Sequence, residues 1–344
     1  MKAILDSPNA DFLFARIHAQ WARALTPAKI LGLLASSSTS ALESALKAAG
    51  IPDPADPGAT RRLTLRFAHD LSRLLTQLDP ATGLFYACFI DRLYLDNLML
   101  ILRIRATPAH REEWAALILD APELPPLHLD PLLQAASAAH MHALLPPSPF
   151  HRRLLPILRE WDAGKDLFLA ECRLDRLTQT TLMAAANGLG DDLAELASRL
   201  AGAELDIAHI LLLLRNLAVY HLAPEQLESL GYGNGRLIQH DAFCALARQT
   251  DTESLVSLLP EPYATGVRKA GPGNPAAVED SLRTLQAGLI ITAFRDYSYP
   301  ERTLIAYPFL RRQELRNTIR LVEGLRLKLP PGEIRDLIIG GAHV

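Results

Sequence analysis

The sequence predicts an all-α fold, and three observations support this prediction. Apolar residues recur at spacings of three and four along the chain, which is the period of a helix with one buried face. Alternation of apolar and polar residues over five or more positions, the pattern of a half-buried strand, is nearly absent. The composition is 49% hydrophobic but 6% aromatic, so Leu and Ala, two good helix formers, must provide most of the core.

A polar residue recurs inside the same apolar pattern at three places, Asn97, His209 and Asn317, which are 112 and 108 residues apart. An apolar residue precedes each one by two positions, and two more follow it by four and five positions. At about 100° per residue these positions form one buried stripe of a helix, with the polar residue at its edge. Because buried polar groups are nearly always hydrogen-bonded, we expect each of these side chains to fix helix packing rather than to line a ligand site.

Short helices are expected to precede each of these three helices. Thr26-Pro27 and Asp130-Pro131 predict helix starts, because Thr or Asp is a good N-cap and Pro suits the first helical position. A third start is expected near Asp241, and Ser40 and Thr252 are predicted to cap further short helices. Each long helix should end before a proline that opens one more short helix, at Pro108, Pro224 and Pro331.

This repeated order divides the chain into three predicted homologous helical domains, at 8–122, 123–230 and 231–344. Stretches rich in Pro and Gly are expected to be loops, because both residues interrupt helices. These stretches are Pro52 to Gly58, Ala121 to Pro126 and Gly271 to Pro275.

Three motifs resemble the signatures of a known family. The first has an acid, Asn-Leu and an Arg at the helix end, here Asp96, Asn97 and Arg103. The middle one has Glu204, Asp206 and Arg215 followed by Gly231-Tyr232, and the last has Glu314, Asn317 and Gly324. In this order and spacing, from about Phe12 to Ile338, they resemble the C-type subunit of rotary A/V-type ATPases (V-type ATP synthases), which is known as d in eukaryotes.

The sequence departs from that family's pattern at three points. His209 stands where Asn is usual, and Gln313 stands where Lys often precedes the Glu. The segment FLFARIH, from Phe12 to His18, matches the usual Tyr and Arg pattern loosely. These departures affect the contacts expected of individual residues more than they affect the resemblance to the family.

The resemblance implies a fold and a function. Three homologous helical bundles would surround a pocket, as a funnel with approximate threefold pseudo-symmetry. The subunit would be non-catalytic, would need no cofactor, and would pass torque between the central-shaft subunits and the membrane rotor ring. It would lie on the cytoplasmic face of the membrane, held there by these partners. Its signature residues would then be structural: Asp96, Asn97, Arg103, Asp206, His209, Arg215, Glu314, Asn317 and Gly324.

Charge and composition argue against other classes of protein. The net charge is −3 and no run of Lys or Arg forms a basic arm, so nucleic acid is not an expected partner. No apolar stretch approaches the roughly 20 residues needed to span a bilayer, and the first residues lack the apolar core of a signal peptide. The three cysteines are far apart and odd in number, which favours free thiols in a reducing compartment: Cys88, Cys172 and Cys244.

Catalytic motifs are not found in the sequence. There is no GxxxxGK[ST] loop for a nucleotide. The glycines of GYGNG, Gly231 to Gly235, follow no predicted strand and are interpreted as a turn. Ser44 to Lys47 matches SxxK by spelling, but the partner motifs of that enzyme class are missing. His140 and His142 lack a third zinc ligand, so neither catalytic residues nor a metal site are predicted.

Two alternatives remain open at this stage. Asp191, Asp192 and Glu195 spell DDxxE, and helical isoprenoid enzymes hold magnesium and diphosphate with such acids. A second converging acidic motif is missing, however, and acids after Gly190 also suit an ordinary helix start. The other alternative is a generic helical scaffold unrelated to the ATPases.

Overall fold

The computed structural model describes residues 10–35, 39–297 and 299–340, and over these residues it is all-α, without a strand. This confirms the fold class predicted from the helical period. The chain forms two compact units, one of Met1–Leu63 with Ala186–Val344 and one of Thr64–Ala185. The boundaries between them fall inside helix α4 (Ala59–Leu75) and helix α10 (Leu167–Asn187).

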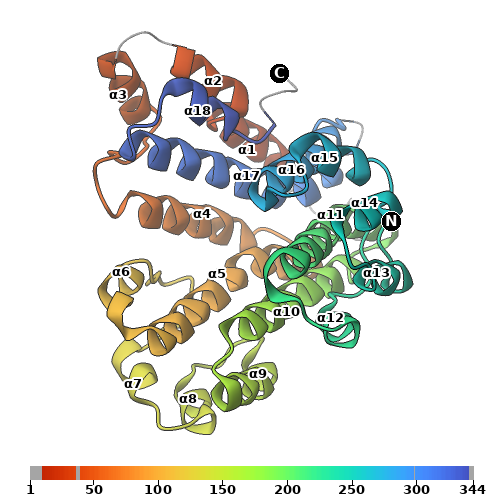
Figure 1. The fold of residues 1–344 in the computed structure, drawn as a ribbon. Coiled ribbons are helices and arrows are strands. Elements are labelled where there is room, and N and C mark those ends of the chain that lie inside the picture. Colours follow the sequence, from red (N-terminus) through yellow and green to blue (C-terminus); the bar gives the residue numbers. More distant parts are fainter. Residues whose placement is uncertain (1–9, 36–38, 298, 341–344) are drawn as a thin grey trace. The chain divides into compact units, whose positions relative to one another are not determined.

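The unit of residues 64–185 is built on the long helix α5 (Pro80–Ala106). Asp79 caps this helix, since its carboxylate accepts hydrogen bonds from the N–H groups of Ala81 and Thr82. Side chains of α5 and α10 share one apolar core with those of the short helices between them. Figure 1 shows these helices in colours from orange (α5) to green (α10). The other elements of this unit are η1 (Pro108–His110), α6 (Arg111–Ala115), α7 (Leu129–Gln134), α8 (Ala138–Leu144) and α9 (His151–Gly164).

Three long helices form the centre of the other unit: α11 (Asp191–Arg215), α16 (Pro275–Phe294) and α17 (Pro300–Arg326). Each of them packs against the other two, and α1 (Ala10–Arg23) packs along α17. Polar side chains that point from one of these helices to another are therefore buried. This packing positions the site described below.

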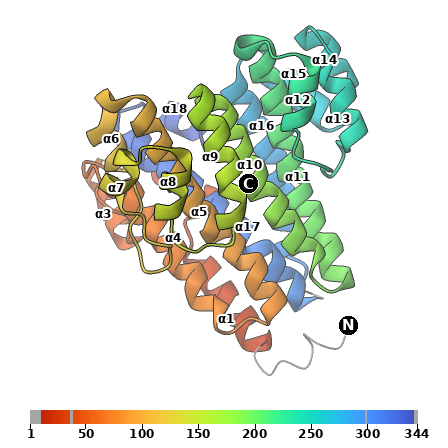
Figure 2. The same cartoon turned by 90° about the horizontal axis from the view of Figure 1, so that it is seen from below.

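Two groups of short helices complete this unit. One group lies around the C-terminal part of α17 (Figure 1). Side chains of this group and of α17 form a second apolar core. The group comprises α2 (Pro27–Ala35), α3 (Thr39–Ala48) and α18 (Pro331–Asp336). The other group packs beside α11 and α16 (Figure 2). It comprises η2 (Asn216–Tyr220), α12 (Pro224–Leu230), α13 (His240–Ala247), α14 (Thr252–Leu258) and α15 (Tyr263–Ala270).

The predicted starts of the first and third segments agree with the structure, because α2 begins at Pro27 and α13 begins at His240. The prolines predicted to follow the long helices each open a short helical element: η1, α12 and α18. The three Pro- and Gly-rich stretches are loops, as predicted, except that the last residue of the third, Pro275, is the first residue of α16.

Three predicted caps were wrong by one or two residues. Helix α7 begins at Leu129, so Asp130-Pro131 lies inside its first turn, where the missing N–H of proline costs nothing. Helix α14 is capped by Asp251 rather than Thr252, because the Asp251 carboxylate accepts the N–H of Ser254. Helix α3 begins at Thr39, so Ser40 is not its cap, and the residues that precede it lie outside the described part of the chain.

The division into 8–122, 123–230 and 231–344 remains a prediction. The two compact units group the chain by contacts and do not compare these segments with one another. The structure does give the segments a similar order of elements, since each has short helices, two long helices and a closing short helix that begins at a proline.

Two further sequence predictions concern membranes and thiols. Over the described residues, none of the helices combines the length and the apolar character needed to cross a membrane. The cysteines are free thiols, of which Cys88 and Cys172 are buried and Cys244 is partly exposed.

Candidate functional site

Asn97 and Asn317 each bind the backbone of a residue that lies 22 positions downstream. The Asn317 amide Nδ2 donates to the carbonyl of Ile339, and the Ile339 N–H donates to Asn317 Oδ1, both over 2.9 Å. Asn97 makes the same pair of bonds with Leu119, over 2.7 and 2.8 Å. Both amides are buried, so the predicted packing bond exists and each amide satisfies one donor and one acceptor of the chain.

His209 occupies the corresponding position in α11 but binds differently. Its Nε2 accepts the N–H of Tyr232, 23 residues downstream, over 2.9 Å. The ring is fully buried against Tyr232 and Phe243, and burial, followed by the charge of His240, lowers the pKa of His209 to about 3. The imidazole is therefore neutral, with its proton on Nδ1. A histidine can thus replace the acceptor half of the asparagine contact and adds ring packing.

Asp206 holds the next part of the same loop. Its carboxylate accepts the N–H groups of Leu237 and Ile238 over 2.9 and 3.0 Å, and the Tyr263 hydroxyl over 2.9 Å. Burial raises the pKa of Asp206, against these three hydrogen bonds. A Cβ on Gly235 would lie 1.9 Å from Asp206 Oδ1, so this loop position requires glycine. The GYGNG segment, predicted to be a turn, is an irregular loop with a bend at Gly233, and α11 holds it from one face.

Glu314 and Gly324 tie α17 to the short helices around it. Glu314 Oε1 accepts the N–H of Leu25 over 2.7 Å, just before α2 begins, and its other oxygen pairs with Arg311. A Cβ on Gly324 would come within 2.8 Å of the Ile334 side chain, so glycine here lets α18 approach α17 closely. Both signature residues therefore have packing roles.

The remaining signature residues are less buried. Arg103 pairs with Glu171 of α10 through its guanidinium, with Nε 3.0 Å from the carboxylate. Asp96 is exposed on α5, and Arg215 is exposed at the end of α11. The nine signature residues therefore have different structural roles. Asp96, Asn97 and Arg103 lie in the unit of residues 64–185, and the other six lie in the other unit.

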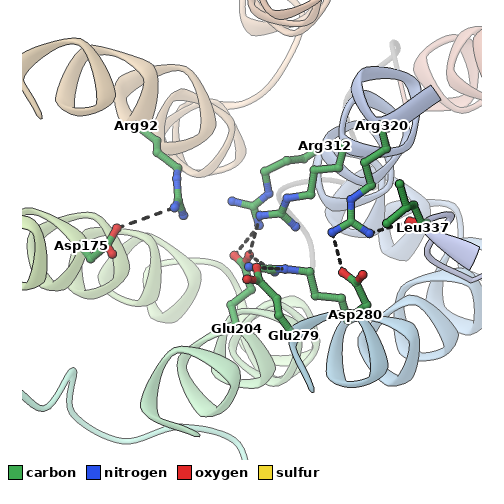
Figure 3. Close-up of polar contacts among 10 residues, drawn as sticks. Arg92, Asp175, Glu204, Glu279, Asp280, Arg312, Arg320 and Leu337 are labelled. Atoms are coloured by element: carbon green, nitrogen blue, oxygen red, sulfur yellow. Dashed lines mark hydrogen bonds and ion pairs between the residues drawn. The ribbon is translucent and has the colours of Figure 1, made fainter. Parts of the chain in front are cut away.

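A cluster of charged residues lies between α11, α16 and α17 (Figure 3). Glu204 of α11 is 3% exposed and pairs with Arg312 of α17. Arg316 Nη2 and Arg283 Nη1 lie 3.8 and 3.9 Å from Glu204 Oε1. Arg283 also donates through Nε to Glu279 over 2.7 Å. One buried carboxylate thus faces three guanidinium groups.

The pKa of Glu279 is lowered by the positive charges around it. Burial acts to raise the pKa of Glu279, but the nearby charges of Arg283, Arg316 and Arg215 and the Arg283 hydrogen bond outweigh it, so the pKa is lowered overall. Arg320, one turn beyond Arg316 on α17, pairs with Asp280 and donates to the Leu337 carbonyl (Figure 3). In the unit of residues 64–185, Arg92 pairs with Asp175 over 3.7 Å.

Comparison with known protein families gives a match over most of the chain. The family described as ATP synthase (C/AC39) subunit matches residues 13–337. The chain belongs to this family. A search of curated proteins finds no significant match.

Membership in the ATP synthase (C/AC39) subunit family confirms the resemblance read from the three motifs. It overturns the alternative of a helical scaffold unrelated to the ATPases, because the match covers nearly the whole chain. The family is a non-catalytic subunit of the ATP synthase, and its members belong to that complex.

The acidic motif of the isoprenoid alternative lies at an ordinary helix start. Gly190 is the N-cap of α11, so Asp192 lies in the first turn, where negative charge suits the helix dipole. Within the described part of the chain, no group of three or more His, Cys, Asp or Glu side chains is placed to hold a metal ion.

Sequence reasoning named Glu204 but missed its arginine partners. A signal was present in α17, since Arg312, Arg316 and Arg320 are four residues apart and so form one stripe of the helix. Arginines at such a spacing usually form a solvated face, however. Only the packing of α11 and α16 against that stripe makes it part of the interior.

Proposed function

We propose that this ATP synthase (C/AC39) subunit is the non-catalytic coupling element between the central-shaft subunits and the membrane rotor ring of a rotary A/V-type ATPase. The observation that supports this most directly is the family match over residues 13–337. In this role the protein passes torque between the part of the complex that makes or hydrolyses ATP and the part that moves ions. It performs no chemistry of its own.

The construction of the interior suits a part that must transmit load. The long helices α11, α16 and α17 pack against one another over much of their length. Buried bonds from Glu204, Asp206 and Asn317 tie them to each other and to the adjoining loops. Because packed interiors are nearly incompressible and charge-assisted hydrogen bonds resist shear, a force applied at one surface would reach another with little deformation.

We further propose that the segments 8–122, 123–230 and 231–344 are homologous domains arranged as a funnel with approximate threefold pseudo-symmetry. Two features support this: the similar order of helices, and the backbone contact 22, 23 or 22 residues after Asn97, His209 or Asn317. Such a funnel would receive the foot of the shaft in its pocket. The protein would then lie on the cytoplasmic face of the membrane, attached through its partners.

Binding to the shaft can be tested with purified proteins. A dye on Cys244, the least buried of the three thiols, would report binding by fluorescence anisotropy, and size-exclusion chromatography would report co-elution. We expect a stable complex with the central-shaft subunits of the same organism, burying on the order of 1,500 Å². A shaft protein truncated at its foot serves as the control and should not bind. Separate elution with the intact shaft would contradict the proposal.

Coupling requires a second experiment on the whole complex in vesicles. Without this protein, the catalytic head should still hydrolyse ATP while ATP-driven ion uptake into the vesicles is lost. Adding back the purified protein should restore uptake. If ion uptake is unchanged in the absence of this protein, the protein is not needed to pass torque to the rotor ring and the proposal is wrong.

A further inference from the structure

Helix α10 contains three threonines whose hydroxyl groups bind the helix itself. The Oγ1 atoms of Thr178, Thr180 and Thr181 donate to the carbonyl oxygens four residues earlier, over 3.1, 2.8 and 2.7 Å. Such bonds compete with the backbone hydrogen bonds of the helix, and they destabilise and bend helices slightly. Threonine is also a weak helix former, because its branched Cβ restricts the side chain. Residues 178–181, here called the threonine segment, are therefore a stretch of low helix stability inside α10.

The threonine segment lies just before the boundary between the two compact units. One unit ends at Ala185, and Ala186, in the same helix, belongs to the other. Ala185 is four positions after Thr181, which is about one helical turn. Bending of α10 at the threonine segment would therefore act directly on the connection between the units.

The chain crosses the same boundary a second time, near the start of α4. Leu63 belongs to one unit and Thr64 to the other. The first turn of α4 is anchored within its own unit, since Thr60 Oγ1 donates to Glu323 Oε1 of α17 over 2.7 Å. Two crossings define a line, and rotation about this line needs bending of two helices only. Compact units that are joined by few chain connections commonly move by rotation about a few such residues.

Each unit, by contrast, is tied internally by buried bonds. Asn97 closes its two hydrogen bonds within the unit of residues 64–185, and Asn317 does so within the other unit. In that other unit, Glu204 of α11 also pairs with Arg312 of α17. Because these contacts resist deformation inside a unit, bending is expected in the crossing helices instead.

We propose that the threonine segment of α10 is a compliant joint, about which the two compact units change their relative orientation as rigid bodies. The crossing at Leu63 and Thr64 in α4 would be the second pivot. Such a joint would exist in the isolated chain, whether or not the proposed function is correct. If that function is correct, the joint would store part of the torque as elastic bending of α10.

Spin labels on the two units test whether the joint moves, through the width of the distance distribution measured by pulsed electron paramagnetic resonance. The labels attach to Arg159→Cys in α9 and Lys269→Cys in α15, which replace exposed residues of different units. Cys244→Ser removes the partly exposed native thiol. A reference pair within one unit is Arg23→Cys with Lys269→Cys. We expect a broader distribution between the units than for the reference pair, and equal widths would overturn the proposal.

Substitution of Thr180 tests whether the threonine segment is the joint. Thr180→Ala removes the competing hydroxyl and raises the helix propensity of this partly exposed position, whereas Thr180→Gly lowers the propensity. The amides of residues 181–186 should exchange about threefold more slowly in Thr180→Ala, and faster in Thr180→Gly. The distance distribution between the units should narrow in the alanine variant and broaden in the glycine variant.

Thr292→Ala in α16 is the matched control. The Thr292 hydroxyl makes the same kind of bond, to the Gly288 carbonyl over 2.8 Å, but both residues lie inside one unit. This variant should slow amide exchange in α16 while the distribution between the units keeps its wild-type width. If Thr180→Ala leaves that width unchanged, or if Thr292→Ala narrows it equally, the proposal is wrong. Binding to the shaft is measured separately, so failure of that binding contradicts the proposed function alone.

Discussion

Asn317 and Ile339 form a closed pair of hydrogen bonds, in which the amide of one side chain satisfies both backbone groups of the other residue. The contact returns the segment after α18 to the middle of α17. Asn97 and Leu119 form the same pair in the other compact unit, with the same separation along the chain. Both asparagines stand in the same apolar sequence pattern, and both bind the residue 22 positions downstream.

Replacement of either asparagine by leucine should destabilise the protein. The substitution leaves one backbone N–H and one carbonyl without a partner, and each orphaned group costs about 1–3 kcal/mol when buried. Urea unfolding followed by circular dichroism would measure the loss. The control is Asn187→Leu, an exposed asparagine that bonds the Ser198 hydroxyl, where the change should be small. Equal effects at all three positions would contradict this account.

His209 should make stability depend on pH in the acidic range. Its pKa is about 3 in the folded protein, against an ordinary value of 6.5, so between these values the unfolded chain binds the extra proton. The free energy of unfolding should therefore fall by several kcal/mol as the pH is lowered from about 6.5 to 3. His209→Asn, which removes the titrating group, should flatten this part of the curve. Thermal melts of the wild type and of His209→Asn at several pH values would show whether the variant loses this pH dependence.

Asp91 should make the free energy of unfolding depend on pH in the direction opposite to that of His209. Burial raises the pKa of this α5 carboxyl to about 6, from an ordinary 3.8, so the folded protein binds the extra proton in that range. The associated stability is present below pH 3.8 and is lost as the pH rises through about 6. Asp91→Asn should consequently raise the free energy of unfolding by about 1–3 kcal/mol at pH 8 and have little effect near pH 3. A loss of stability at pH 8 would show that the ionised carboxylate makes a favourable contact.

Gly235→Ala should disturb the loop that Asp206 holds. The new methyl would lie 1.9 Å from Asp206 Oδ1, so the loop or the carboxylate must move and the hydrogen bonds to Leu237 and Ile238 weaken. A loss of about 1–3 kcal/mol is expected from overpacking. Gly288→Ala in α16 is the control, because nothing lies near its added methyl and alanine favours helix. Hydrogen exchange of the Leu237 and Ile238 amides would localise the effect.

The amino-acid sequence by itself determined the features that depend on local interactions. The helical period predicted the all-α fold, and the prolines at 108, 224 and 331 predicted where the closing short helices begin, because a proline acts on its own turn of the chain. Caps were predicted less accurately. Thr252 and its neighbour Asp251 can both cap a helix, and the choice between them depends on which backbone is extended.

Tertiary structure decided which polar residues meet. The sequence indicated that Asn97 and Asn317 need partners, but Leu119 and Ile339 offer backbone groups that every residue has, so no pattern could identify them. The same holds for Glu204 and Arg312, which are more than 100 positions apart and lie together because α11 and α17 pack side by side. Burial then makes a common kind of charge pair part of the interior, where the cost of removing both charges from water depends on the helices that surround them.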